Sequence, residues 1–387
     1  MFNIKFAIFQ PSQKHTEIFG TFIEYFLKMG FNFDIFYNSS NDKYSFIDYY
    51  QRLFNKKFKI FSPKRLFERM HLYDYFLFTT SKDLLPTIFK LIPEKCVYVV
   101  HQSTYHLSHM RKSIIVSPLI RSDSLSIVEK PYVLPIYRKI NNLIITNKNN
   151  FAVIGTFRFN KSTRVCYDKD MDQIEKLLKM KFKKDFKIFF FMRKNDWRKL
   201  SRYFPIIKNN NRIVNYPGLS TINMVKKLEN VKFILPLAKK KGLFHWERLT
   251  GSIPLAVNLN IPMVIDEELM NIYDLKGCIT YKNNLYESFD KALNINKSDY
   301  SELIEQVVRY KAENSKINEK KLNKLFFSDN KNIFKEAKKE LEDFDKLNEN
   351  TEETIKFTEN KKKEKNLNKN EKKATDSELK IILDNFF

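Results

Sequence analysis

The sequence predicts an α/β protein of two Rossmann-like, doubly wound domains that face each other across a cleft, followed by a disordered basic C-terminal tail. Its 387 residues are too many for one ordinary domain with a single hydrophobic core and are enough for two domains. Hydrophobic residues make up 43% of the chain. A strand, a helix and a second strand follow one another at the start of the chain, and the same order begins again near Phe151. Each such unit begins a parallel sheet.

The first half opens with a strand at 5–10, a polar turn and a helix at 18–29 that Gly30 ends. A second strand at 31–37 completes a parallel strand–helix–strand unit. Apolar runs predict further strands at 73–80, 96–102, 113–120 and 132–137, with an amphipathic stretch at 84–91.

The second half repeats this order with a strand at 151–155, a helix at 171–180 and a strand at 186–193. Further strands are predicted at 212–216, 231–235, 263–265 and 277–281. After Ser301 the chain turns helical, and we expect this helix to cross back to the first domain. We place the domains at 1–145 and 146–335, and a charged low-complexity tail that cannot bury enough apolar surface at 336–387.

The formal charge of +24 suits a nucleic-acid ligand, but the richness in Lys and Asn extends over the whole chain and indicates a compositional drift. We therefore expect no nucleic-acid partner. Three widely spaced cysteines indicate neither a disulfide framework nor a zinc site, which fits a reducing compartment. The chain shows no signal peptide and no membrane-spanning run, so we expect a soluble cytoplasmic protein and leave open a peripheral contact with an anionic membrane.

The segment most informative about function is 231–266, VKFILPLAKKKGLFHWERLTGSIPLAVNLNIPMVID. It resembles the donor-binding segment of GT-B fold glycosyltransferases of the group 1 type, which contain a Glu-x7-Glu motif. When Pro262 is matched to the proline of that pattern, Glu247 matches the first Glu and Leu255 stands at the second. The resemblance covers about residues 3 to 300. It implies an enzyme that transfers a sugar from a nucleotide-sugar donor to a glycan, protein or lipid acceptor, with 1–145 as acceptor domain and 146–335 as donor domain.

Four residues at two strand ends of the second domain are expected to bind the donor diphosphate. Gly155 would let the backbone approach the phosphates and Arg158 would pair with them, although a structural turn with a surface arginine explains this loop equally well. Arg193 and Lys194 end the next strand and resemble the basic pair that neutralises the diphosphate in this fold.

Glu247 is expected to accept hydrogen bonds from sugar or ribose hydroxyls, unless it only forms a local ion pair with Arg248. The amides of Thr250, Gly251 and Ser252 would face an anion at a helix start, or form an ordinary N-cap.

On the acceptor side, Gln13, His15 and Glu17 follow the first strand. His15 or His101 is a candidate general base, and a surface histidine is the alternative for each. The catalytic candidates are therefore His15, His101 and Glu247. The run DKDMD at 168–172 contains an Asp-x-Asp pattern, but we interpret it as the polar start of a helix and not as a metal-binding motif. We therefore expect no metal and no cofactor beyond the nucleotide sugar as co-substrate.

Three other functions stay open at this point. A nucleotide-sugar epimerase shares the architecture but needs a carboxylate and histidine arrangement that the sequence does not identify. A non-catalytic binding protein would explain the missing second Glu. A nucleic-acid binder would depend on the Lys-rich tail.

Overall fold

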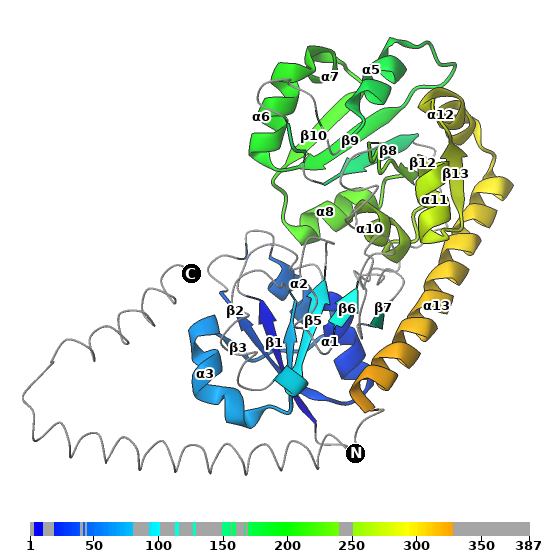
Figure 1. Cartoon of the computed structure of the whole chain (residues 1–387). Helices are drawn as coiled ribbons and strands as arrows, with labels where there is room; N and C mark the ends of the chain where they lie inside the picture. Colours follow the sequence, from blue (N-terminus) through cyan, green and yellow to red (C-terminus); the bar gives the residue numbers. More distant parts are fainter. Residues whose placement is uncertain are drawn as a thin grey trace, which may run out of the picture.

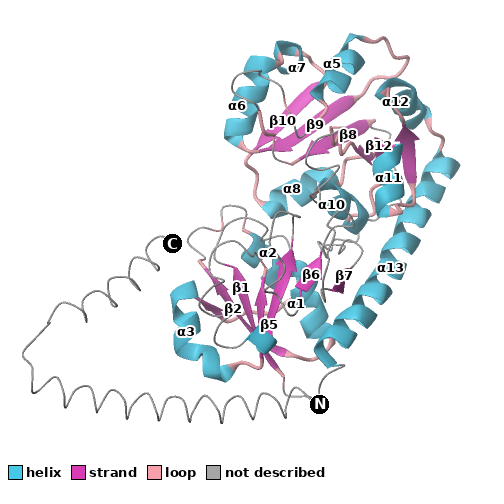
Figure 2. Ribbon diagram, in the orientation of Figure 1, coloured by secondary structure: helices cyan, strands magenta, loops and turns pink. Residues whose placement is uncertain are grey.

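The computed structural model describes residues 4–10, 19–38, 42, 45–79, 93–100, 113–115, 127–128, 149–155, 157–159, 166, 169–239 and 251–327. They form two parallel β-sheets with helices on both faces, arranged as two lobes (Figure 1; Figure 2). The predicted α/β class with two doubly wound sheets is thereby confirmed.

The first lobe is built on a seven-stranded sheet with the strand order β3-β2-β1-β4-β5-β6-β7. Every pair of neighbouring strands in it is parallel. Its elements are β1 (Lys5–Gln10), α1 (Phe19–Lys28), β2 (Asn32–Tyr37), α2 (Phe46–Leu53), β3 (Ile60–Phe61), α3 (Leu66–Arg69), β4 (Tyr75–Phe78), β5 (Cys96–Val100), β6 (Ser113–Ile115) and β7 (Ile127–Val128), with single 3-10 turns at Pro63–Arg65, Met70–Leu72 and Pro93–Lys95.

Alternate side chains of β1 enter two different hydrophobic clusters, as the two-residue period of a strand requires. Phe6 and Ile8 belong to the cluster that includes α1 and α2, whereas Ala7 and Phe9 belong to the cluster that includes Leu66 of α3. Both faces of the sheet are therefore covered, which is usual for parallel sheets.

The second lobe is built on a six-stranded parallel sheet with the order β10-β9-β8-β11-β12-β13. This is the order of a doubly wound dinucleotide-binding sheet. Its elements are β8 (Asn150–Ile154), α5 (Met171–Lys179), β9 (Lys187–Met192), α6 (Lys194–Tyr203), α7 (Pro205–Asn209), β10 (Ile213–Pro217), α8 (Thr221–Leu228), β11 (Phe233–Ile234), α10 (Ser252–Asn258), β12 (Met263–Asp266), α11 (Glu267–Tyr273), β13 (Cys278–Tyr281) and α12 (Leu285–Asn294).

The helices of the second lobe also divide between two faces. Phe151 and Phe190 share a cluster with α5, α6, α7 and α12, whereas Ala152 and Phe189 share the other cluster with α8, α10 and α11. The second of these clusters also contains the residues of α1 and α2 from the first lobe, and α2 contacts α8. One hydrophobic core is therefore continuous between the lobes.

A 31-residue helix, α13 (Lys297–Phe327), runs along both lobes (Figure 1). Near its start the Tyr300 hydroxyl donates to Lys232 O at 2.7 Å, in the second lobe. At its other end the Phe326 ring lies 5.1 Å from Phe6 and 5.7 Å from Tyr75, between centroids, in the first lobe. The expectation of a helix that returns to the first domain is confirmed.

Most predicted strands have counterparts, and the differences lie in short elements. Of the strand predicted at 113–120 only 113–115 is described as a strand. In the first lobe β3, β7, α2 and α3 were not predicted. The strand predicted at 132–137, the stretch at 84–91 and the domain boundaries at 145/146 and 335/336 lie outside the described residues.

Candidate functional site

The candidate site is the edge of the second sheet where its strands end. Because the strand order reverses between β8 and β11, the connections that leave these two neighbours go to opposite faces and open a crevice between them. Ligands of doubly wound sheets bind at such a switch point. Gly155, at the end of β8, adopts φ +127°, a conformation that favours glycine.

A buried lysine occupies the switch point. Lys169 is 1% exposed, and its ammonium group donates to Pro236 O just beyond β11. A Cβ atom placed on Gly155 would lie 3.9 Å from Lys169 Nζ, so the ammonium group also borders the end of β8. The sequence prediction treated 168–172 only as the polar start of a helix and missed this residue. A single lysine among acidic residues has no periodicity that would have marked it as buried.

Asp196 holds the loop after β8 against the start of α6. Its Oδ2 atom accepts a hydrogen bond from Phe157 N at 3.2 Å. Burial raises the pKa of this carboxyl group, and the Phe157 amide and the nearby charges of Arg193, Lys199 and Arg158 oppose that rise. The predicted residues Arg158 and Arg193 therefore both lie near Asp196, which was not itself predicted as a site residue.

Arg193 is exposed at the N-cap of α6, directly after β9, as predicted. Lys194 follows it and is also exposed, but its aliphatic stem lies over Gly218, beyond β10, where an added Cβ would be 3.4 Å from Lys194 Cγ. Arg193 thus lies toward the β8 side of β9, and Lys194 lies toward the β10 side. Arg193 shares Asp196 with Arg158, whereas Lys194 lies on the outer side of the sheet.

Gly251 and Ser252 mark the start of α10, as predicted. Gly251 is exposed and occupies the N-cap position, and Ser252 is 2% exposed. With seven residues, all of them buried, α10 contributes mainly to the hydrophobic core.

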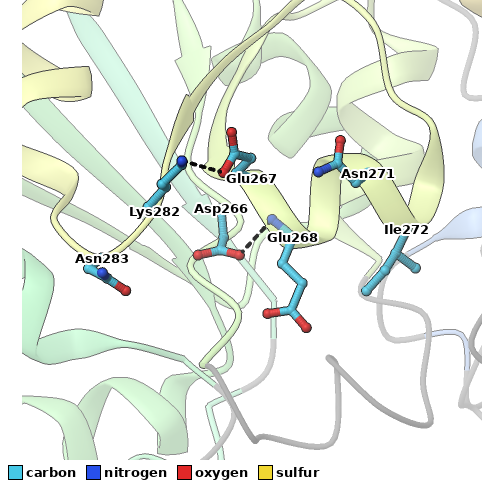
Figure 3. Close-up of a pocket in the computed structure, with 7 residues that line it drawn as sticks. All are labelled: Asp266, Glu267, Glu268, Asn271, Ile272, Lys282 and Asn283. Atoms are coloured by element: carbon cyan, nitrogen blue, oxygen red, sulfur yellow. Dashed lines mark hydrogen bonds and ion pairs between the residues drawn. The ribbon is translucent and has the colours of Figure 1, made fainter.

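An acidic pocket lies at the other end of the same sheet edge, beyond β12 and β13. It is a cavity of about 520 Å³ lined by Asp266, Glu267, Glu268, Asn271, Ile272, Lys282 and Asn283 (Figure 3). Asp266 ends β12 and caps α11, since its Oδ1 accepts from Glu268 N at 3.0 Å. Lys282 lies 3.7 Å from the Glu267 carboxylate and partly balances the acidic charge.

A buried tyrosine connects this pocket to the switch point. The pKa of Tyr281, at the end of β13, is raised by burial and also by the charges of Asp266 and Asp170. Asp170 follows Lys169 in the chain, and its N–H donates to Leu237 O at 2.8 Å. Burial raises the pKa of the Asp170 carboxyl group, and Lys239 opposes the rise. Tyr281 therefore lies near both Asp266 of the pocket and Asp170, which follows Lys169 of the switch point.

Asp266 and its pocket were not predicted as a site. The sequence contained one usable signal, because an aspartate at the end of an apolar strand and directly before Glu-Glu-Leu is typical of a helix N-cap. The cavity beside it depends on how β13 and α11 pack and has no counterpart in the sequence.

The charge along this edge changes sign. Arg158, Arg193 and Lys194 follow β8 and β9. At the other end, Asp266 is the last residue of β12, and Glu267 and Glu268 follow it. A ligand that spans the edge would meet cations at one end and carboxylates at the other. Such an arrangement suits a molecule with phosphates at one end and hydroxyl groups at the other.

Several predicted site residues lie outside the described residues, and their placement stays a prediction. These are Gln13, His15, Glu17, His101, Glu247 and Thr250. They include all three catalytic candidates.

In the ranges that the structure describes, no three His, Cys, Asp or Glu side chains are grouped so that they could hold a metal ion. The expectation that no metal is needed remains a prediction. None of the described helices has the length and apolar character that a membrane crossing requires.

Comparison with known proteins identifies the fold. No protein-family model and no curated protein sequence matches the chain. Among solved structures, an alpha-glucosyltransferase in complex with UDP and a 13-mer DNA containing a HMU base matches with a TM-score of 0.53 and 12% identity, over 80% of this chain and 95% of that one. A candidate UDP-N-acetylglucosamine 2-epimerase from Listeria monocytogenes matches with a TM-score of 0.50 and 10% identity, over 85% and 98%. The chain therefore has the GT-B fold.

Proposed function

We propose that this protein is a glycosyltransferase that binds a nucleotide-sugar donor along the carboxyl edge of the second sheet and transfers the sugar to a hydroxyl acceptor. The observation that carries this proposal is the change of charge along that edge, from Arg158 and Arg193 to Asp266 and its pocket. A nucleotide sugar has the matching pattern, with two phosphates between a ribose and a sugar that both present hydroxyl groups.

The chemistry of sugar transfer explains why both the basic end and the acidic end of this sheet edge would be needed. The departing nucleoside diphosphate gains negative charge in the transition state, and cationic side chains placed beside it lower the barrier. Arg193 and Arg158 would take this role, which is supported by the position of both near Asp196. Carboxylates such as Asp266 would orient hydroxyl groups by accepting hydrogen bonds. His15 or His101 would act as the base that takes the acceptor proton, and Glu247 would bind sugar or ribose hydroxyls.

Nucleotide binding tests the donor half of the proposal. We expect UDP or GDP to raise the melting temperature of the full chain, and one of a panel of radiolabelled nucleotide sugars to be hydrolysed. Replacing Arg193 by Gln should weaken nucleotide binding by about tenfold or more, because a charge-assisted hydrogen bond contributes about 1.5 to 3 kcal/mol. Isothermal titration of both proteins with the same nucleotide gives the ratio.

The matched control is Arg202→Gln, which removes an exposed arginine from the last turn of the same helix, α6. This variant should bind nucleotide as the unchanged protein does. An equal loss in both variants would show that the effect is general electrostatics, and no thermal shift with any nucleotide would overturn the donor site.

The second candidate function is nucleotide-sugar epimerisation. It is favoured by one observation, the match of 98% of the Listeria candidate epimerase to 85% of this chain. Incubation with a nucleotide sugar and no acceptor distinguishes the two activities. Conversion of the donor into its epimer, seen by proton NMR, supports the epimerase, whereas release of free nucleotide supports the transferase. A non-catalytic binding protein would bind nucleotide and yield neither product.

A further inference from the structure

The positive charge of the chain is densest in one part of the second lobe, although the first half is also basic, with 21 Lys and Arg against 11 Asp and Glu in residues 1–149. Residues 150–239 contain 21 Lys and Arg against 7 Asp and Glu, whereas residues 251–327 contain 10 against 11. The tail at 336–387 contains 12 against 14 and therefore has no net positive charge. A nucleic-acid function that depends on the tail loses its electrostatic basis.

Much of this charge lies at the amino-terminal edge of the second sheet, opposite the candidate site. There the end of α5, the connection to β9 and the end of α7 meet, and α5 packs on α7 (Figure 1). We name this surface the basic tip and define it as exposed Lys176, Lys179, Lys181, Lys183, Lys184, Lys187 and Lys208, half-buried Arg212, and the apolar side chains Met180 and Ile206.

The connection 180–187, MKFKKDFK, turns its aromatic rings inward and its lysines outward. The Phe182 ring lies 5.2 Å from the Phe186 ring and 5.5 Å from Phe289 of α12, between centroids. Phe186 therefore belongs to the core, and half-buried Phe182 packs against it. Arg212 Nη1 donates to Met180 O at 3.4 Å. The lysines of this segment are thus presented on a structured surface.

The cations of the basic tip are poorly balanced by acidic groups. Within the described part of the chain none of its lysines forms an ion pair, and the only acidic residues between 173 and 187 are Glu175 and Asp185. The pKa of nearby Lys232 is lowered, mainly by burial and further by the charge of Lys184. Like charges are therefore close enough to repel, and an anionic partner would relieve that repulsion.

Two exposed apolar side chains among the lysines favour a lipid bilayer over nucleic acid as the anionic partner. Met180 is 44% exposed and Ile206 is 37% exposed. A surface with both lysines and exposed apolar side chains suits the interface of a bilayer, where cations meet headgroups and apolar groups enter the acyl boundary. Single-stranded nucleic acid instead favours exposed aromatic rings, and those of segment 180–187 are turned into the core.

We propose that the basic tip docks the second lobe onto an anionic lipid surface, with Met180 and Ile206 entering the interface. Because the tip lies at the opposite edge of the sheet from Gly155, Arg193 and Asp266, docking leaves the candidate site accessible. The proposal stands independently of the proposed function.

The full chain is tested by sedimentation with vesicles of phosphatidylcholine that contain about 30% phosphatidylglycerol, and with pure phosphatidylcholine vesicles, in about 0.1 M salt. We expect binding only to the anionic vesicles. The triple change Lys181→Gln, Lys183→Gln and Lys184→Gln should lower the partition coefficient about 100-fold. The control triple Lys56→Gln, Lys57→Gln and Lys59→Gln makes the same charge change at exposed positions of the first lobe and should leave binding within about threefold.

A second variant, which leaves the charge unchanged, distinguishes binding to lipid from binding to nucleic acid. Met180→Gln with Ile206→Gln should lower vesicle binding about tenfold and leave any binding to a DNA duplex unchanged. Circular dichroism spectra and melting temperatures close to those of the unchanged protein should show that all variants are folded. The proposal is overturned if the full chain does not bind anionic vesicles, or if the control triple loses as much vesicle binding as the Lys181, Lys183 and Lys184 triple. It is also overturned if that triple loses binding to a DNA duplex but keeps its binding to vesicles.

Discussion

Lys311 places its ammonium group in the junction between the two lobes. Its Nζ donates to Asn258 O at 2.8 Å, at the end of α10, while Glu24 of α1 is near enough to act on it. Burial lowers the pKa of Lys311 to about 8, and the Glu24 charge limits the decrease. At neutral pH the protein therefore holds a charged lysine in a place that disfavours the charge.

This burial predicts a rise of stability with pH. Between about pH 8 and pH 10, unfolded Lys311 holds its proton while folded Lys311 releases it, so the unfolded state binds more protons and the free energy of unfolding increases. Urea denaturation at several pH values from 7.5 to about 9.5 should show this increase relative to a Lys311→Met variant. Parallel curves for the two proteins would contradict the lowered pKa.

At the scale of single residues, the sequence prediction identified groups by chemistry and strand position. Arg193 and Gly155 were predicted as site residues because a basic residue and a glycine directly follow apolar strands. Lys169 and Asp196 were missed because their importance comes from burial and from partners 67 and 39 residues away in the chain. Such contacts leave no local pattern.

At the scale of elements, the approach of α13 to β13 depends on one glycine. Gly277 adopts φ +70°, and an added Cβ would collide with Leu303 O and lie 2.9 Å from Val307 N, both in α13. Gly30 has the same φ of +70° at the end of α1, but nothing lies within 4 Å of its Cβ position. The two glycines therefore share a left-handed backbone conformation that would strain a residue with a Cβ, and they differ in the packing around them.

Replacing each glycine by alanine separates these two effects. Gly30→Ala should cost about 1 to 2 kcal/mol of stability, the cost of a left-handed conformation for a residue with a Cβ. Gly277→Ala should cost at least about 1 kcal/mol more, because α13 must also shift. Equal losses in urea denaturation would show that α13 can move without cost.

At the scale of the whole molecule, the end of α13 attaches the helix to the first lobe. Phe326 is 1% exposed and contacts the rings of Phe6, Tyr25 and Tyr75. The helix therefore belongs to both lobes, and its last turn fills part of the first core.

Removing this ring tests the attachment. Phe326→Ala should lower the free energy of unfolding by about 3 to 5 kcal/mol, as expected for a buried aromatic side chain. Ile317→Ala, at a position of α13 that is 41% exposed, is the matched control and should change it by less than about 0.5 kcal/mol. A small effect of Phe326→Ala in urea denaturation would mean that the last turn of α13 does not dock.

The sequence alone determined the α/β class, the two parallel strand–helix repeats and most strand positions. These follow from the local periodicity of apolar residues and from the glycines and polar runs that mark the ends of strands and helices. Tertiary structure alone decided that Arg158 and Arg193 would both lie near Asp196, that Lys169 would be buried at the switch point, and that a cavity would form beside Asp266. The physical reason is that strand order brings distant segments together at one sheet edge, and burial then sets the charge and hydrogen bonding of each group.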